Sequence, residues 1–303
     1  MEGLHLPDNL KVHFAGSEAQ HQFLVAELMG VRYFLYSAYP FVERKVMKTA
    51  KSPIIPFKWM QNPAVDIPAN IFKHSLHCIQ DSGLFTLMFG ANAGNKDEAI
   101  VNRWYDGLVE FTLNHGQHVT CVEVDCQKIL GVEKAWEFRQ RMRNDLPNNR
   151  IINVFHLEDG KYGLDRLIEY SDYIAISVPE LRKNQRKNYV GKLARYIKQR
   201  KPTIDIHLLG CTDTKMIEDN KFLTTSDSTS YMWPKIRGYV IPGHAKCSVK
   251  TDEIIKMVGE EVYAKMREYN NEENTNTLAL SVAIEKKKYL RLAGNQDYYA
   301  EIK

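Results

Sequence analysis

The sequence lacks the features that mark membrane, secreted and disulfide-rich proteins. None of its apolar runs approaches the ~18 residues that a membrane-spanning helix needs. Its first residues, Met1–Pro7, carry no basic region followed by an apolar core. Its five cysteines among 303 residues are scattered along the chain. We therefore expect no membrane partner, no signal peptide, a cytoplasmic location and reduced, mostly buried thiols.

The sequence also lacks a glycine-rich loop of the kind that cradles a nucleotide. The stretch Gly90–Gly94 has neither the lysine of a Walker motif nor the spacing of a Rossmann fingerprint. Nothing therefore indicates nucleotide hydrolysis or a nicotinamide cofactor. With 44% hydrophobic and 26% charged residues, the chain has the composition of an ordinary globular protein.

Short apolar segments rich in β-branched residues recur along the chain, and most are followed by a segment with helical spacing. Strands that alternate with helices form parallel sheets with right-handed crossovers. Eight such strands favour a closed (β/α)8 barrel, a TIM-like barrel of the α/β class, over an open sheet. The predicted strands are 11–15, 31–36, 76–80, 119–124, 151–155, 173–177, 204–209 and 222–226.

We predict a single barrel domain over residues 1–303, with the barrel core at about 11–243 and a helical extension at about 244–303. A capping box at Ser17–Gln20 is predicted to open the first helix. The segment 38–73 contains five prolines and is expected to be a loop with at most short helices. Because loops of this length are usually functional, we expect this insertion to contact the substrate.

Residues 182–201 contain nine lysine or arginine residues and no acidic residue. One interpretation is a solvated amphipathic helix whose apolar stripe is Val190, Leu193, Ala194 and Ile197. Its outer face would still be wholly unneutralised, which is typical of proteins that bind a phosphate backbone. The residues that we predict to contact nucleic acid are Arg182, Lys183, Arg186, Lys187, Lys192 and Arg195, together with the aromatic Trp233.

Two predicted strands have a carboxylate at their C-terminal end, which is where the catalytic residues of β/α barrels lie. Asp227 follows the strand 222–226 and has hydroxyl-bearing neighbours on both sides. Asp81 follows the strand 76–80 and precedes Ser82 and Gly83. Taken alone, Asp227 could instead cap the next helix or turn, since aspartate followed by serine and threonine is ordinary turn chemistry.

The same face of the barrel would carry Asp125, His156, Ser177, Glu180 and Gly210, because each follows a predicted strand. These carboxylates, with Asp81 and Asp227, and the histidine suggest acid–base and covalent chemistry on a neutral, hydrogen-bonding substrate. Two carboxylates at short distance would be the arrangement of a retaining glycosidase. Taken singly, Asp125 could cap a helix, His156 could be a satisfied histidine, and Glu180 could pair with surface cations.

The segment Ile79–Thr86 resembles the Asp-Ser-Gly-Gly-Phe-Gln motif of the guanine transglycosylases, and the similarity extends over roughly residues 74–240. The zinc site of that family is missing, because only His244 and Cys247 lie where it would be, too few for a tetrahedral site. The segment 227–231, Asp-Ser-Thr-Ser-Tyr, is most similar to the phage and bacterial branch that modifies DNA.

This resemblance implies a pentosyltransferase that replaces guanine in DNA by a preQ0-like 7-deazaguanine through a covalent glycosyl–aspartate intermediate. It implies that Asp227 is the nucleophile, that Asp81 is the general acid/base, and that the target nucleotide is flipped out of the duplex. Neither a cofactor nor a metal is required by this chemistry. The residues implied to contact the base are Ser82, Phe85, Asp125, His156, Ser177, Val178 and Gly210.

The implied partners are DNA, guanine and a 7-deazaguanine, and a system of this kind leaves room for accessory modification proteins. Three alternatives stay open at this point. A tRNA-guanine transglycosylase would use the same chemistry on tRNA. A catalytically silent relative would keep the barrel and the basic segment for nucleic-acid binding alone. A barrel hydrolase acting on a sugar or a small nucleoside would explain the carboxylates but leave the basic segment unused.

Overall fold

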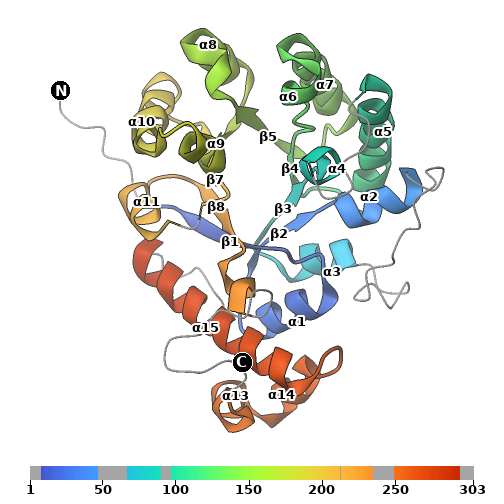
Figure 1. Ribbon diagram of the computed structural model, residues 1–303, viewed down its shortest axis with the longest axis vertical. Coiled ribbons are helices and arrows are strands. Elements are labelled where there is room, and N and C mark those ends of the chain that lie inside the picture. Colours follow the sequence, from blue (N-terminus) through green and yellow to red (C-terminus); the bar gives the residue numbers. More distant parts are fainter. Residues whose placement is uncertain (1–7, 47–66, 90–96, 212, 235–248, 294–303) are drawn as a thin grey trace.

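The computed structural model describes residues 8–46, 67–89, 97–211, 213–234 and 249–293. At its centre is a closed barrel of eight parallel strands in sequence order, in which β8 pairs with β1 (Figure 1). The predicted (β/α)8 barrel is therefore confirmed. The strands are β1 (Lys11–Ala15), β2 (Tyr33–Ser37), β3 (His77–Asp81), β4 (Thr120–Val122), β5 (Arg150–Phe155), β6 (Tyr173–Ser177), β7 (Asp205–Leu209) and β8 (Thr225–Ser228).

Helices surround the barrel on its outside (Figure 1). Apolar residues of the helices pack against the outward-facing residues of the strands and form the main hydrophobic core. The helices are α1 (Gln20–Leu28), α2 (Tyr39–Val46), α3 (Ile67–His74), α4 (Leu84–Phe89), α5 (Glu98–His115), α6 (Gln127–Leu130), α7 (Val132–Asp145), α8 (Gly160–Tyr170), α9 (Val178–Lys183), α10 (Val190–Arg200), α11 (Thr214–Asp219), α13 (Thr251–Val258), α14 (Glu260–Met266) and α15 (Glu272–Ala293), with the short 3-10 turns η1 (Leu157–Asp159), η2 (Lys187–Tyr189) and η3 (Ser230–Met232).

The start of the first helix differs from the prediction. Helix α1 begins at Gln20, and the residue before it, Ala19, is extended. The hydroxyl of Ser17 donates to the carbonyl oxygen of Phe14 at 2.8 Å, so it does not cap the helix. The predicted capping box is therefore wrong, and the side chain of Glu18 points to another strand instead.

The proline-rich segment 38–73 contains two short helices, α2 and α3, in agreement with the prediction. The residues between these helices, 47–66, lie outside the part that the structure describes. The predicted contact of this segment with a substrate stays a prediction.

The basic segment 182–201 is not one continuous helix. It comprises the end of α9, the turn η2 and helix α10, and Gln185, between α9 and η2, has a left-handed φ of +56°. The predicted apolar stripe is confirmed within α10, because Val190, Ala194 and Ile197 are buried and Leu193 packs against the core. The break separates the cations of α9 from those of α10.

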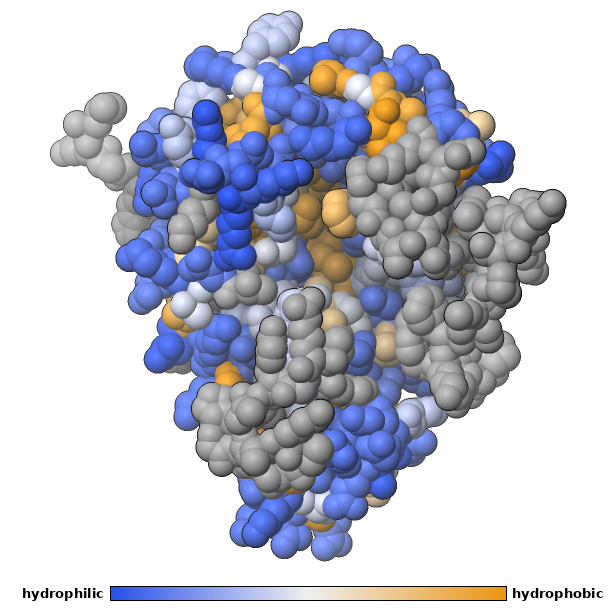
Figure 2. All heavy atoms as spheres, viewed as in Figure 1, coloured by the Kyte–Doolittle hydropathy of each residue, from blue (hydrophilic) through white to orange (hydrophobic). Residues whose placement is uncertain are grey.

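Helix α15 closes the ring of helices between the last and the first units of the barrel (Figure 1). It contacts α1, α11 and η3, with α13 and α14 packed beside it. Figure 2 shows the same view in space-filling form, with hydrophilic residues gathered over α8 and α10 and a hollow near the barrel centre. In the described part of the chain, no helix combines the length and apolar character needed to cross a membrane.

The barrel interior contains histidines beside its apolar residues. His13 of β1 is fully buried, and its Nε2 lies 2.8 Å from Nδ1 of His77 at the start of β3. The Nε2 atom of His77 lies 2.9 Å from the hydroxyl of Thr120. Burial and the neighbouring histidines lower the pKa of His13 well below its usual value, and burial lowers that of His77 to about 4. Both rings are therefore neutral at pH 7 and serve as hydrogen-bonding residues of the core.

Candidate active site

Asp227 lies inside β8, one position beyond the end of the predicted strand. The strand continues because Asp227 and Ser228 pair with His13 and Phe14 of β1. Its Oδ1 accepts the backbone N–H of Gly210 at 2.7 Å and lies 3.2 Å from Nε2 of His207, which is fully buried in β7. Asp227 is therefore held by the neighbouring strand and does not cap a turn. In the described residues, no hydrogen bond engages its Oδ2 atom.

Asp81 is the last residue of β3 and lies at the same end of the barrel. Its Oδ2 accepts the backbone N–H of Gly83 at 3.0 Å. Gly83 has a φ of +73°, and a Cβ there would lie 2.7 Å from the backbone nitrogen of Tyr39, so only glycine fits this turn. Burial, together with the charges of Asp227 and Asp125, raises the pKa of Asp81 to about 6 despite the Gly83 hydrogen bond.

Glu18 is a third acid near Asp81, and the sequence analysis missed it. Its Oε2 accepts the backbone N–H of Ser37 at 3.2 Å, and Ser37 pairs in register with Asp81. Burial raises the pKa of Glu18 to about 7, and the charge of Asp81 adds to the rise. Near neutral pH this carboxyl is therefore divided between its protonated and ionised forms.

We expect the Glu18→Gln variant to be more stable than the wild type above about pH 7. Because the folded protein raises the pKa of Glu18 from 4.5 to about 7, the wild type loses stability as the pH rises through this window. The glutamine amide carries no charge and still accepts the N–H of Ser37. The gain in free energy of unfolding should be roughly 2 kcal/mol at high pH and absent at low pH. Denaturant unfolding on both sides of the window measures it, and an equal difference at both would contradict the assignment.

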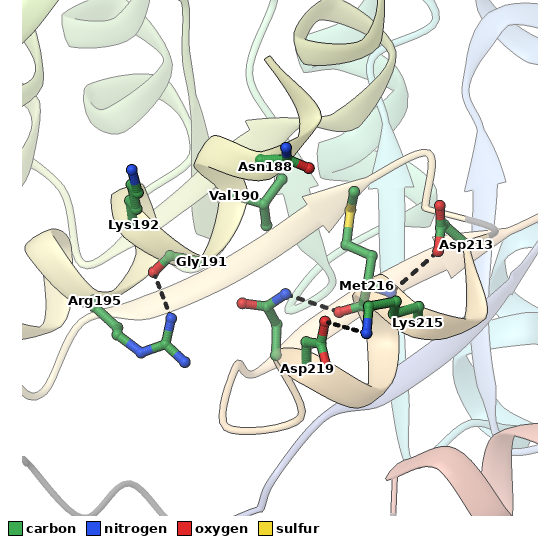
Figure 3. A pocket seen from close by; sticks show the side chains of 10 residues that line it. Asn188, Val190, Gly191, Lys192, Arg195, Asp213, Lys215, Met216 and Asp219 are labelled. Carbon is green, nitrogen blue, oxygen red and sulfur yellow. Dashed lines mark hydrogen bonds and ion pairs between the residues drawn. The ribbon is translucent and has the colours of Figure 1, made fainter. Parts of the chain in front are cut away.

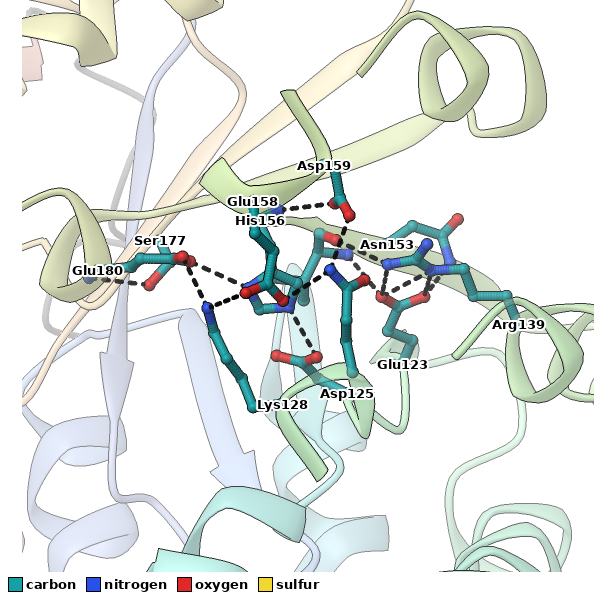
Figure 4. A network of polar contacts seen from close by, with 12 residues as sticks. Glu123, Asp125, Lys128, Arg139, Asn153, His156, Glu158, Asp159, Ser177 and Glu180 are labelled. Carbon is teal, nitrogen blue, oxygen red and sulfur yellow. Dashed lines mark hydrogen bonds and ion pairs between the residues drawn. The ribbon is translucent and has the colours of Figure 1, made fainter. Parts of the chain in front are cut away.

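His156, just after β5, is clamped between two carboxylates (Figure 4). Its Nε2 lies 2.8 Å from Oδ1 of Asp125, and its Nδ1 lies 3.0 Å from Oε2 of Glu180. Burial alone would lower its pKa, but the hydrogen bonds and charges of Asp125 and Glu180 raise it to about 10. His156 is therefore a charged imidazolium at pH 7, with both N–H groups committed.

The other side of this network is formed by Lys128, which lies 3.0 Å from Oε1 of Glu180 and 3.3 Å from Oε2 of Glu158. Burial alone would raise the pKa of Glu180, but His156 and Lys128 lower it to about 2. Glu180 is thus a counter-ion of both His156 and Lys128, and no ion pair in the described residues joins it to Arg182 or Lys183. Of the three clamped side chains, Asp125 is the most open to solvent, at 30% exposure against 4% for His156.

The remaining residues predicted to contact a base lie around this end of the barrel in different environments. The hydroxyl of Ser177 accepts the N–H of Glu180 at 3.3 Å and caps α9. Val178 is fully buried in the main core, so its side chain does not line the barrel mouth. Ser82 is buried, whereas Phe85 on α4 is 75% exposed. Of these side chains, Phe85 is the most open to a ligand, and Ser177 is half-buried.

A buried ion pair, which the sequence analysis missed, involves the residues that immediately precede Asp125 and His156. Arg139 of α7 donates to both carboxylate oxygens of Glu123 at 2.8–3.0 Å, and both side chains are 3% exposed. Glu123 also accepts from Nδ2 of Asn153 at 2.6 Å and from the N–H of Val154 at 2.9 Å. This network ties the ends of β4 and β5 together, immediately before Asp125 and His156.

We expect Arg139→Met to destabilise the protein by about 3 kcal/mol, because Glu123 would remain buried without its counter-ion. The matched control is Arg141→Met on the same helix, whose guanidinium pairs with Asp106 at the surface at 3.3 Å. The control should cost at most about 1 kcal/mol. Denaturant unfolding near pH 7 measures both losses, and equal losses would show that the buried pair adds no more stability than a surface pair.

Acidic residues neutralise part of the predicted basic surface. Arg182 lies 3.6 Å from Asp213, Arg200 lies 3.8 Å from Asp165, and Lys201 lies 2.6 Å from Asp172. Lys198 is buried and donates to two backbone carbonyls. The expectation of a wholly unneutralised face is therefore wrong. The predicted contact residues that are exposed in the structure are Arg182, Lys183, Arg186, Lys192 and Arg195, while the side chain of Lys187 lies outside the described part.

The two aromatic residues after β8 differ in accessibility. Tyr231 is 1% exposed and packs against Phe14 with ring centroids 5.0 Å apart, so it is a core residue that cannot stack on a base. Trp233 is half-buried at the end of η3. Of the two, only Trp233 remains a candidate for stacking on nucleic acid.

No cluster of histidine, cysteine or acidic residues within the described ranges is arranged to hold a metal ion. His244 and Cys247 lie outside those ranges. Four of the cysteines, Cys78, Cys121, Cys126 and Cys211, are free and buried, as the sequence predicted for most of them.

Comparisons with known proteins leave the family open. No family model matches the chain, and no curated protein matches it. Among solved structures, the chain is similar to the fructose-bisphosphate aldolase of Campylobacter jejuni, with 12% sequence identity and a TM-score of 0.43 over 95% of this chain and 91% of that chain. A function for this chain is therefore inferred from the residues of the site itself.

Proposed function

We propose that this protein is an enzyme that exchanges guanine in DNA for a 7-deazaguanine through a glycosyl ester on Asp227. The observation that carries the proposal is the pair of aspartates with unlike surroundings at one end of the barrel. Asp227 is fixed by the N–H of Gly210, while the pKa of Asp81 is raised to about 6 by burial and neighbouring charge. Base exchange needs one carboxylate that attacks and one that gives and takes a proton.

In the proposed reaction, an oxygen of Asp227 attacks C1′ of a flipped-out deoxyguanosine. The C1′–O bond forms, the bond from C1′ to N9 of guanine breaks, and the leaving guanine takes a proton from Asp81. The ionised Asp81 then removes the N9 proton of the incoming 7-deazaguanine. That nitrogen attacks C1′, and Asp227 is released as a carboxylate. The raised pKa of Asp81 suits a group that changes protonation state in each half-reaction.

We assign recognition of the guanine edge to Asp125, whose carboxylate can accept from N1–H and from the exocyclic amine. His156 acts on Asp125 and not on the base, because both of its nitrogens already face carboxylates. This changes the role expected from the sequence, in which His156 was grouped with the residues that contact the base. His156 is a positioning residue in this proposal.

The decisive experiment is a base-exchange assay with labelled guanine and a labelled 7-deazaguanine, offered double-stranded DNA in one arm and tRNA in another. Label that enters DNA, and that is lost in Asp227→Asn, supports the proposal. Label that enters only tRNA keeps the chemistry and changes the polymer. Label in neither, with DNA binding intact, favours a silent nucleic-acid binder. Release of base from free nucleosides alone favours a hydrolase.

A further inference from the structure

A pocket of about 490 Å³ lies between α10 and α11 on the outside of the barrel (Figure 3). Helix α10 contributes Gly191, Lys192 and Arg195, while Lys215 and Asn220 come from α11 and the residue that ends it. The carboxylates of the candidate active site do not line this pocket. Its volume falls within the range of sites that hold small molecules.

Asn220 places a hydrogen-bond acceptor without a partner in the wall of this pocket. The side chain is 4% exposed, and its Nδ2 donates to the carbonyl oxygen of Met216 at 2.8 Å, which fixes the orientation of the amide. The Oδ1 atom has no hydrogen-bond partner in the described part of the chain. A buried acceptor left in this state costs free energy, so a ligand with an N–H or O–H donor would satisfy it.

The pocket also carries positive charge that its own acids do not balance. Asp213 caps α11 through the N–H of Met216 and lies 3.6 Å from Arg182, and Asp219 lies 3.8 Å from Lys215. In the described residues, neither acid lies within ion-pair distance of the exposed side chains Lys192 and Arg195. An anionic group is the expected complement of these two cations.

Gly191 allows the guanidinium and the amide to face the same space. A Cβ at this position would lie 2.9 Å from Nη1 of Arg195 and 3.1 Å from Oδ1 of Asn220. Gly191 is the second residue of α10, and its missing side chain keeps this corner of the pocket open. The donor group and the acceptor group can therefore reach one ligand together.

We propose that this pocket binds a nucleotide unit, that is, a phosphate ester that also carries a hydroxyl or amino donor. Lys192 and Arg195 hold the phosphate, and Asn220 Oδ1 accepts from the donor. Tyr189, next in sequence to two lining residues, is 42% exposed, and the charged groups of Arg186 and Lys192 each lie 5.4 Å from the centre of its ring. The assignment of the ligand as a nucleotide of the DNA chain, next to the exchanged base, rests on the proposed function. The binding of a phosphate ester in this pocket is independent of the proposed function.

The test is titration calorimetry of the full chain with inorganic phosphate, with deoxyguanosine 5′-monophosphate and with a short single-stranded DNA. Arg195→Gln should weaken binding of the mononucleotide or the DNA by at least about 10-fold, since it removes a charge-assisted hydrogen bond. The matched control is Arg200→Gln on the same helix, which pairs with Asp165 outside the pocket and should change binding less than about 2-fold. Gly191→Ala is the second variant, because it favours the helix and still narrows the pocket.

Saturable binding that weakens in Arg195→Gln and Gly191→Ala but not in Arg200→Gln supports the site. Binding of DNA alone assigns the site to the polymer, and binding of the mononucleotide alone assigns it to a free nucleotide. No saturable binding, or equal loss in the Arg200→Gln control, overturns it. Asp227→Asn separates this inference from the proposed function, because it abolishes exchange and leaves binding at this pocket unchanged.

Discussion

The Asp227→Asn variant is expected to lose base exchange by on the order of 10⁴-fold or more, because it removes the attacking carboxylate. The amide oxygen of asparagine can still accept the N–H of Gly210, so the fold around β8 should be retained. Denaturing gel electrophoresis should show a covalent complex between the wild type and DNA, and none for the variant.

The control for this experiment is Asp205→Asn, a change of the same kind at the start of β7, at the opposite end of the barrel. It should retain the covalent complex. A full yield of complex from Asp227→Asn would rule out Asp227 as the nucleophile. Loss of the complex in both variants, with normal unfolding curves, would show that the effect is not specific to the site.

The second large effect is expected for Asp81→Asn, which should slow exchange by about 10³-fold. Asparagine cannot transfer a proton, so guanine must leave C1′ without being protonated and its displacement by Asp227 becomes slow. The pKa of Asp81 is raised to about 6, so the glycosylation step of the wild type should slow as the pH rises above about 6, when Asp81 ionises. This decline should be absent in Asp81→Asn.

Single-turnover measurements of complex formation between about pH 5 and pH 8 test this prediction. They separate formation of the covalent complex from its resolution by the incoming base, which needs the ionised form of Asp81. A variant that keeps the pH dependence of the wild type would show that another group supplies the proton. Glu18 would then be the first candidate, since its pKa is raised to about 7 and it lies near Asp81.

The barrel and the ends of its strands could be predicted from the sequence because their signals are local. Each strand is a short apolar run, and each boundary is marked by residues that break the pattern. The strands before Asp81 and Asp125 were predicted to end within two residues of where they do, since β3 includes Asp81 and β4 ends at Val122. The sequence did not show that Asp227 lies within β8, because it remains in the strand through its pairing with β1, which lies more than 200 residues away in sequence.

The residues missed by the sequence analysis have partners that are distant along the chain. Glu18 belongs to a pattern that fits a capping box, and only the arrangement of β1 and β2 shows that its carboxylate reaches Ser37. The role of His156 depends on Glu180, which follows the next strand. Arg139 is a charged residue on an amphipathic helix. Its burial against Glu123 is a result of tertiary packing and could not be predicted from the helix pattern. No periodicity in the sequence marks such pairs.

The closure of the barrel by the two ends of the chain has a consequence for how the protein is made. During synthesis β1 leaves the ribosome before the other seven strands, yet one of its edges pairs with β8, and α1 packs against α15. The nascent chain must therefore keep an open strand edge until β8, more than 200 residues after β1, has emerged. Contacts between such distant residues form slowly, and an open edge attracts other chains. Truncation before β8 should yield a chain that aggregates, however well the first seven strands are formed.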